Sequence, residues 1–494
     1  MTERSLRRLR LIAAISAVAL STRLARCAAP FPDGLRPGPF RVGYASEVLS
    51  DPSRTGFSGT PGRPVHLQMW YPAIESGIEP VTRRRYIEDE ARLEDARRPG
   101  PAEVERAADR WIAQHGAAGA SRRDFDALFA QRTPAVPAAP FASGPFPLVL
   151  YFHTGALEKS IQCEFLASRG FVVVSASVAG TFEPELEVAA SGAETEARDL
   201  EVAESWAFRT APLIPNSVGV VGMSFGGISE LVFAARHPET RAIVSLDGGG
   251  GSASGAATIE ASPFFDVVRV RAPILHEFSP EGADLEFLES LRYSDRTFAK
   301  FPGLHHRDFS GSGILTDFAR SSPAAERARA GVNRLMAEFL RSHLLAGKPT
   351  DGEPAAPAEP GEEIRRLARV PEPPLTFEEL RAIVRSRGVG VVAEEAERRK
   401  AQDPRPLSEE TFRKLGSWLF DEGRAWDARR LFELQAAMYP QSARARFFSA
   451  IACRATGDAD GARDKFREAL ALLPTDPGMD GPTRRRIEKT ARTP

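Results

Sequence analysis

The stretch Ser217-Val-Gly-Val-Val-Gly-Met-Ser-Phe-Gly-Gly-Ile-Ser-Glu-Leu-Val-Phe-Ala-Ala-Arg236 decides the fold. Its first part, 217–221, is apolar without polar alternation, as expected of a strand buried on both faces. Its last part, 226–236, is long and apolar enough for a buried helix. Between them, Gly222-Met-Ser224-Phe-Gly226 leaves room only for a tight turn in which the outer residues must be small. The stretch therefore predicts a strand, a sharp turn and a helix.

Strands and helices alternate on both sides of this unit. Further buried strands are predicted at 147–152, 170–175, 242–246, 273–278 and 296–301, and further helices at 161–168, 194–208 and 324–343. Two earlier runs, 40–48 and 65–71, are typical of antiparallel strands at a sheet edge. Such alternation predicts an α/β fold class, a mostly parallel sheet with helices on both faces, spanning 37–346.

Residues 83–132 interrupt the alternation with charged, alanine-rich sequence of helical spacing. We interpret them as a helical insertion. It either covers a site or forms a solvated helical excursion, and the composition favours neither.

The C-terminal third has a different organisation. Residues 347–374 are rich in Pro, Glu and Gly and predict a linker. Beyond them, landmarks recur 34 residues apart, namely Gly423 and Gly457, Ala428 and Ala462, Phe432 and Phe466, and Pro440 and Pro474. This period resembles that of tetratricopeptide repeats, so we expect an all-α repeat domain over 375–477, able to bind a protein or peptide partner, and a disordered tail over 478–494.

The N-terminus resembles a secretory signal peptide. Basic residues up to Arg10 precede the apolar run Leu11–Leu20, and small residues lead to Ala29. We therefore expect a signal peptide over 1–29 and a periplasmic or secreted protein. The alternative is an uncleaved membrane anchor, but a run of about ten apolar residues is too short to span a bilayer, so no transmembrane span is expected in the mature chain.

The overall charge excludes one class of partner. The chain has 65 Lys plus Arg against 66 Asp plus Glu, so it has no net positive charge that would attract nucleic acid. The three cysteines lie far apart, and no disulfide framework is expected. The run Gly248–Gly251 is not followed by Gly-Lys-Ser/Thr and is not a phosphate loop. We expect neither a cofactor nor a metal.

Ser224 is the candidate nucleophile. A serine hydroxyl is a weak nucleophile at neutral pH and needs a histidine to take its proton. His306 and His305 follow the last predicted strand, where a loop can deliver this base, and we favour His306. His276 falls inside a predicted strand and is expected to pack within the sheet.

A carboxylate must hold the imidazole in the correct tautomer. Asp247 ends the strand 242–246, and Asp284 follows the next strand. Both positions lie at the carboxyl edge of the predicted sheet, so both remain candidates for the acid.

The oxyanion formed on attack needs backbone N–H donors. One is expected from Phe225, directly after the nucleophile, and the other from the turn at Thr154 and Gly155, after the strand 147–152. His153 in this turn is expected to be structural.

Together these residues resemble the platelet-activating-factor acetylhydrolase group of α/β-hydrolases and the related dienelactone-hydrolase-like enzymes, over roughly 38–343. The resemblance is carried by Gly38-Pro-Phe-Arg-Val-Gly-Tyr44, Met69-Trp-Tyr-Pro72, His153-Thr-Gly155, Gly222–Gly227 and His306-Arg-Asp-Phe309. In that group the acid follows the strand after the nucleophile, which implies Asp247 rather than Asp284. The chain departs from the pattern in two places: the usual His-Gly is His153-Thr154, and dienelactone hydrolases use a cysteine where Ser224 stands.

The resemblance implies a serine carboxylic ester hydrolase that works through an acyl-enzyme, on a small-molecule or lipid ester such as a short-acyl phospholipid. Two alternatives remain. A serine peptidase shares the same machinery, and an interaction scaffold would act through the repeats with an inert hydrolase fold.

Overall fold

The computed structural model describes residues 31–56, 59, 61–92, 99–116, 119–181, 183, 185–318, 322–345, 363–371, 375, 377–399, 406–476 and 481–491. The predicted signal peptide and most of the predicted linker lie outside these residues. The chain divides into two compact units, Met1–Val370 and Pro371–Pro494, which are described separately. Among the described helices, none has the length and apolar composition that a membrane crossing requires.

Unit 1 is built on a ten-stranded sheet in the order β10-β9-β8-β7-β6-β4-β5-β2-β1-β3. The strands are β1 (Arg41–Thr55), β2 (Pro61–Ala73), β3 (Ala135–Pro137), β4 (Phe146–Phe152), β5 (Val172–Ala176), β6 (Leu213–Met223), β7 (Ala242–Leu246), β8 (Ile274–Phe278), β9 (Arg296–Lys300) and β10 (Glu363–Leu367). The central strands, β4 to β9, pair in parallel, whereas β2 and β10 pair antiparallel with β5 and β9.

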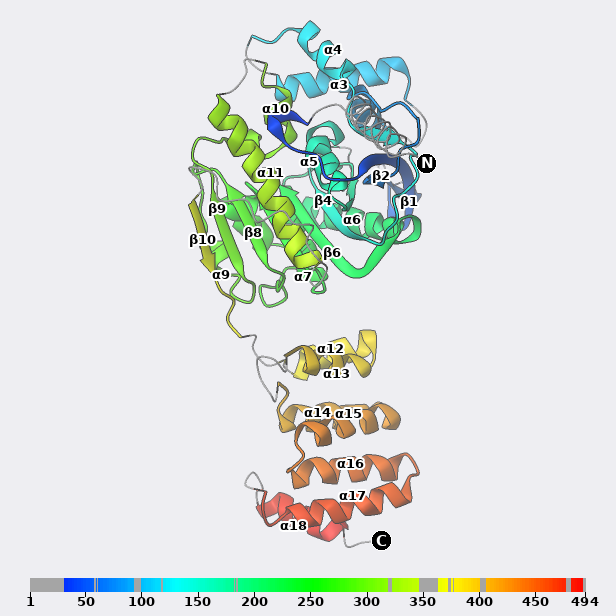
Figure 1. Ribbon diagram of the computed structural model, residues 1–494. Helices are drawn as coiled ribbons and strands as arrows, with labels where there is room; N and C mark the ends of the chain where they lie inside the picture. The colour runs from blue at the N-terminus through cyan, green and yellow to red at the C-terminus, as the bar shows by residue number, and fades with distance from the viewer. Residues whose placement is uncertain are drawn as a thin grey trace, which may run out of the picture. The chain divides into compact units, whose positions relative to one another are not determined.

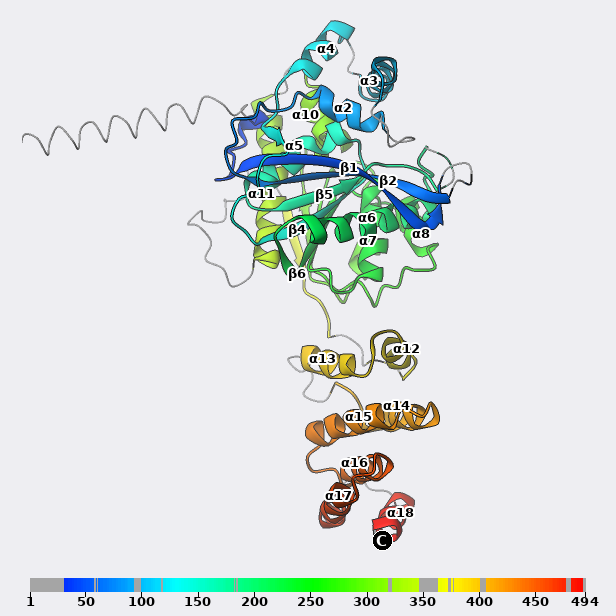
Figure 2. The same cartoon turned by 90° about the vertical axis from the view of Figure 1, so that its right-hand side faces the viewer.

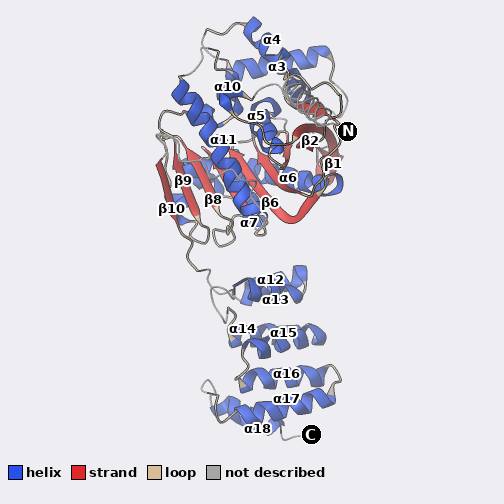
Figure 3. Ribbon diagram, in the orientation of Figure 1, coloured by secondary structure: helices blue, strands red, loops and turns tan. Residues whose placement is uncertain are grey.

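Helices cover both faces of the sheet. Side chains alternate along β4, so Leu148 and Leu150 enter one hydrophobic core while Val149 and Tyr151 enter the other. The helices α5 (Ala156–Ser168) and α11 (Pro323–Leu344) lie on one face, and α6 (Ala190–Thr210), α7 (Gly226–Arg236) and α8 (Ala253–Glu260) lie on the other (Figure 2). Figure 3 shows the strands between these two layers. The predicted α/β-hydrolase architecture is confirmed.

The remaining short elements of unit 1 are the helices α9 (Glu286–Ser290) and α10 (Gly311–Leu315) and the 3-10 turns η1 (Pro32–Gly34), η3 (Gly249–Gly251) and η4 (His306–Phe309). The turns η3 and η4 follow β7 and β9 directly along the chain. They therefore lie near the carboxyl edge of the sheet.

The predicted insertion consists of three helices, α2 (Arg84–Glu90), α3 (Pro101–His115) and α4 (Arg122–Ala130). Their large side chains Tyr86, Trp111 and Phe125 are buried in the same core as α5 and α11. The insertion is therefore packed onto the hydrolase core and is not a solvated excursion.

The strand β10 corrects the predicted linker. The residues Glu363–Leu367 fall within 347–374, yet they pair antiparallel with β9 and form the edge of the sheet. The guanidinium of Arg365 lies 4.7 Å from the ring centroid of Phe298, and Arg296 donates a 2.8 Å hydrogen bond to the carbonyl of Ala368. Local composition suggested no structure because the strand is held by contacts with β9, about 65 residues earlier, and not by its own apolar residues.

Unit 2 is a run of packed helices (Figure 1). They are α12 (Phe377–Arg387), α13 (Gly390–Arg399), α14 (Glu409–Asp421), α15 (Ala425–Met438), α16 (Ala443–Ala455), α17 (Ala459–Leu472) and α18 (Gly481–Ala491). The repeat landmarks Ala428 and Ala462 are buried between helices, while Gly423 and Gly457 take positive φ angles of 73° and 84° at the turns. The predicted all-α domain is confirmed. The prediction of a disordered tail over 478–494 is wrong for the helix α18, whose Ile487 is buried against the neighbouring helices.

Candidate active site

The candidate nucleophile stands on the sharp turn between β6 and α7. Ser224 has a φ of 56°, and its backbone N–H donates a 3.2 Å hydrogen bond to the Leu246 carbonyl. A Cβ at Gly222 would overlap the carbonyl oxygen of Gly226, and one at Gly226 would lie 2.6 Å from the carbonyl oxygen of Phe152. Both glycines are therefore required by close backbone approach, as the pentapeptide predicted.

His306 connects this serine to a carboxylate. Its Nε2 lies 2.9 Å from Ser224 Oγ, and its Nδ1 lies 2.7 Å from Asp247 Oδ2. A carboxylate only accepts hydrogen bonds, so Nδ1 carries the proton and Nε2 is free to accept the serine proton. The predicted residues Ser224, His306 and Asp247 are thus brought together in one chain of hydrogen bonds.

Asp247 is oriented by the ends of two strands. It follows β7 with a φ of 44°, and its backbone N–H donates a 2.7 Å bond to the Glu277 carbonyl in β8. Its Oδ1 accepts a 2.9 Å bond from the Ser279 N–H, which leaves Oδ2 for His306. The neighbouring strand therefore fixes the plane of this carboxylate.

The alternative base and acid point elsewhere. The His305 side chain is 68% exposed, and its Nδ1 lies 3.2 Å from Glu281. Asp284 is exposed and accepts a 3.1 Å bond from the Glu286 N–H at the start of α9. Neither residue shares a hydrogen bond with Ser224 in the described part of the chain.

The glycine run Gly248–Gly251 packs against the serine turn. A Cβ at Gly227 would lie 2.5 Å from the Gly248 Cα, and the Gly249 N–H donates a 2.7 Å bond to the Ser224 carbonyl. The absence of side chains in this run therefore allows close backbone contact between α7 and the loop that carries Asp247.

The turn after β4, His153–Gly155, supplies the candidate oxyanion donors. His153 and Thr154 have positive φ angles of 61° and 64°, and the His153 ring lies 5.8 Å from the Phe225 ring. The His153 N–H donates to Glu196, so it is not free for an oxyanion. Within the described residues, no acceptor is bound by the backbone N–H groups of Phe225, Thr154 or Gly155.

Two carboxylates in this region, the buried Glu196 and the half-buried Glu90, were not predicted. Glu196 in α6 accepts from the His153 N–H, and Glu90 in α2 accepts a 3.1 Å bond from the Leu157 N–H. These residues are 43 and 67 positions from their partners. The one signal in the sequence was an acidic residue at a helix position whose spacing otherwise predicts a buried, apolar side chain.

A cavity of about 440 Å³ adjoins the three residues. His276 in β8 lines it and is 1% exposed, stacked on Phe278 with 5.3 Å between ring centroids. Burial lowers the pKa of His276 to about 4, so the ring is neutral at pH 7. His276 packs within the sheet, as expected, and also forms part of the cavity wall.

One family model matches part of the chain. Residues 67–257 match the family described as X-Pro dipeptidyl-peptidase (S15 family), a segment that contains Ser224 and Asp247 but not His306. None of the curated proteins matches the chain significantly.

Two solved structures are similar. A ferulic acid esterase from Streptomyces cinnamoneus is 20% identical over 68% of this chain and 98% of that chain, with a TM-score of 0.46. An acylaminoacyl peptidase from Pyrococcus horikoshii is 18% identical over 42% of this chain and 39% of that chain, with a TM-score of 0.33. The resemblance to acetylhydrolases is confirmed as far as the α/β-hydrolase fold, while the matching family model is that of S15 peptidases. The chain therefore has the α/β-hydrolase fold and, over residues 67–257, is similar to the S15 peptidase family.

Proposed function

We propose that the chain hydrolyses carboxylic esters, with Ser224 as nucleophile, His306 as general base and Asp247 as the group that orients the imidazole. One observation carries this proposal, namely the continuous hydrogen bonds of 2.9 and 2.7 Å that join Ser224 Oγ, His306 and Asp247. A strained, positive-φ serine held in this way has its hydroxyl directed at the base.

The reaction would proceed through an acyl-enzyme. Ser224 Oγ attacks the ester carbonyl while its proton passes to His306 Nε2, and the oxyanion accepts hydrogen bonds from the N–H groups of Phe225 and Thr154. Collapse expels the alcohol, which takes the proton from His306. Water then attacks the acyl-enzyme with His306 again as base, which releases the acid and restores Ser224.

A peptidase is the second candidate, and the family match over 67–257 favours it. Esters and amides pass through the same tetrahedral intermediate, but an amide requires His306⁺ to protonate a poorer leaving group. Ester cleavage is placed first because the resemblance of residues 38–343 to acetylhydrolases implies it. We also propose that the protein is exported, on the signal-like residues 1–29.

The test uses p-nitrophenyl acetate and acetyl p-nitroanilide, which share one acyl group. Wild type is expected to hydrolyse the ester faster and to be labelled by a fluorophosphonate at Ser224. Ser224→Ala should lose both ester turnover and labelling, whereas Ser254→Ala, which changes another serine of the cavity wall, should be labelled like wild type. Ester turnover by Ser224→Ala at the wild-type rate would disprove the proposal, and faster anilide cleavage would favour the peptidase.

A further inference from the structure

A second cavity, of about 600 Å³, lies against the turn His153–Gly155. Its other walls come from the insertion, through the end of α2 and one side of α3, and from the segment after β5. Residues that contribute to these walls include Glu90, Ala107, Trp111, Gln114, His115 and Leu186.

Residues in contact with one another line this cavity and the cavity beside Ser224. The His153 ring lines the second cavity and packs against Phe225, which lines the first. Leu186 lines the second cavity, and Val188, two residues later, lines the first. The oxyanion turn therefore forms the boundary between the two cavities.

The proton transfers decide which part of a substrate lies in each cavity. His306 must protonate the leaving alcohol, so the alcohol lies on the side of His306, which lines the first cavity. The scissile carbonyl lies between Ser224 and the turn, and its acyl substituent extends away from His306. We propose, as an extension of the proposed function, that the second cavity binds the acyl part of the ester and prefers an acyl group that bears hydrogen-bond donors.

The walls of the second cavity explain this preference. Ala107, Trp111 and Leu186 are apolar, but Glu90, Gln114 and the pair His115–Glu158 are polar. The His115 Nε2 lies 3.0 Å from Glu158 Oε1, so these two side chains are paired with each other, whereas Glu90 and Gln114 line the cavity outside this pair. A purely hydrocarbon chain would cover these groups without replacing their hydrogen bonds to water, whereas a hydroxyl or amide N–H on the chain would satisfy them.

The carboxylates among the lining side chains, Glu90, Glu158 and Glu185, outnumber the single guanidinium of Arg110, so the wall favours ligand donors over acceptors. Burial is the largest cause that raises the pKa of Glu90 to about 7; the hydrogen bond from the Leu157 N–H lowers the pKa and the neighbouring carboxylate of Glu158 raises it, both within that value. At pH 8 the cavity therefore presents an ionised acceptor that has only the Leu157 N–H as a hydrogen-bond donor among the described residues.

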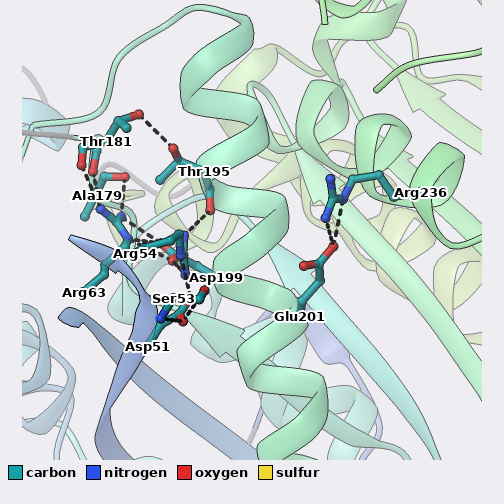
Figure 4. Close-up of polar contacts among 11 residues, drawn as sticks. Asp51, Ser53, Arg54, Arg63, Ala179, Thr181, Thr195, Asp199, Glu201 and Arg236 are labelled. Carbon is teal, nitrogen blue, oxygen red and sulfur yellow. Dashed lines mark hydrogen bonds and ion pairs between the residues drawn. The ribbon is translucent and has the colours of Figure 1, made fainter. Parts of the chain in front are cut away.

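The opposite wall is held in place by a buried arginine (Figure 4). The Arg63 guanidinium donates hydrogen bonds of 2.7, 3.2 and 3.4 Å to the carbonyls of Gly180, Thr181 and Ala179. It also binds both carboxylate oxygens of Asp199 in α6. This segment continues directly from the lining residue Val178, so this part of the cavity wall is preorganised.

The experiment compares three p-nitrophenyl esters with acetyl, heptanoyl and 6-hydroxyhexanoyl groups. The last two are of nearly equal size and differ in a terminal methyl or hydroxyl group. Wild type is expected to favour the hydroxylated ester over the heptanoyl ester by about tenfold in kcat/KM. Gln114→Trp, which places a large side chain at the exposed edge of the cavity, should lower kcat/KM for the 6-hydroxyhexanoyl ester relative to acetate by about tenfold.

The matched control is Ala113→Trp, an exposed neighbour in α3 that does not line the cavity and should behave like wild type on all three esters. Preference for the heptanoyl ester, or an unchanged ratio in Gln114→Trp, would overturn the inference. Failure of the wild type to hydrolyse the acetate at all would instead contradict the proposed function.

Discussion

The Glu196 carboxylate accepts a hydrogen bond from the backbone N–H of His153. Its second oxygen accepts a 2.5 Å bond from the Ser229 hydroxyl in the first turns of α7. Glu196 is 4% exposed, so neither bond competes with bulk water. One side chain of α6 therefore connects the oxyanion turn with the helix that carries the nucleophile.

We expect Glu196→Ala to lower kcat by about 10–100-fold with a small change in KM. The two proposed oxyanion donors, at Thr154 and Phe225, would stabilise charge only in the transition state, so a shift between them should affect kcat. Steady-state kinetics with p-nitrophenyl acetate measures the effect.

The conservative variant Glu196→Gln separates positioning from folding. Its amide oxygen can accept from His153, so it should recover most of the activity, and Ser229→Ala should cost less than Glu196→Ala. A rise in KM at constant kcat would show that Glu196 does not position the oxyanion turn.

Asp247→Asn should reduce kcat by about 10³-fold or more. An amide in place of the carboxylate can donate to His306 Nδ1, and the imidazole would then present its proton, rather than its lone pair, to Ser224. Both ring nitrogens of His306 are within hydrogen-bond distance of a partner, 2.7 Å from Asp247 and 2.9 Å from Ser224, so the tautomer determines whether His306 can accept the serine proton.

Asp284→Asn is the matched control, because Asp284 is exposed and accepts a hydrogen bond from the Glu286 N–H. It should keep activity within about twofold of wild type, since surface changes of this kind have small effects. The reverse result, an inactive Asp284→Asn and an active Asp247→Asn, would transfer the role of the acid to Asp284.

The elements around the serine were predictable because their signals are local. The helix 226–236 and the strand 242–246 were predicted with the bounds that the structure has. Uninterrupted apolar runs indicate buried strands. The glycines of the turn are required by steric contacts with nearby residues, so they indicate a tight turn. Strand order placed the candidate acids and bases after the serine, and the family resemblance then favoured Asp247 over Asp284.

The contacts that the sequence did not predict are distant ones. Glu196 and Glu90 act on backbone groups far along the chain, and no residue pattern encodes which N–H each one binds. The strand β10 was missed for a related reason, because an exposed edge strand needs few apolar residues of its own. The second cavity depends on how α3 packs against the hydrolase core, which is also a tertiary property.

Glu90→Gln should stabilise the protein above neutral pH. Burial is the main cause that raises the pKa of Glu90, from 4.5 to about 7, so the folded state binds the proton more tightly than the unfolded state. The free energy of unfolding of wild type therefore falls as pH rises from about 4.5 to about 7, and the loss persists above that range. The glutamine variant has no such loss and should be more stable by on the order of 1–3 kcal/mol at pH 8.

Urea unfolding of both proteins at pH 4.5 and pH 8 measures this difference. The difference should nearly vanish at the lower pH, where Glu90 is protonated in the folded state and about half protonated in the unfolded state. Glu75→Gln, at an exposed position, should show no pH-dependent difference from wild type. A stability difference of the same size at both pH values would mean that proton binding by Glu90 is not its cause.

Gly416→Ala in unit 2 tests the packing of the helical repeats, because helix propensity and packing predict opposite changes in the stability of this unit. Helix propensity alone predicts that alanine inside α14 stabilises by about 1 kcal/mol. The structure predicts the opposite, because a Cβ at this position would overlap the Phe432 ring, which is stacked on Phe448 with 5.2 Å between centroids. We therefore expect a net loss of about 1–3 kcal/mol from overpacking.

Amide hydrogen exchange of α14 and α15 in the full chain reports this local stability. Exchange should accelerate in Gly416→Ala and return toward the wild-type rate in the double variant Gly416→Ala/Phe432→Leu, since the smaller side chain removes the overlap. Ser417→Ala, the next residue of the same helix, is the matched control. Slower exchange in Gly416→Ala would show that α14 and α15 do not pack as closely as the Gly416–Phe432 contact requires. Ester turnover should stay unchanged in all of these variants, because unit 1 has its own hydrophobic cores.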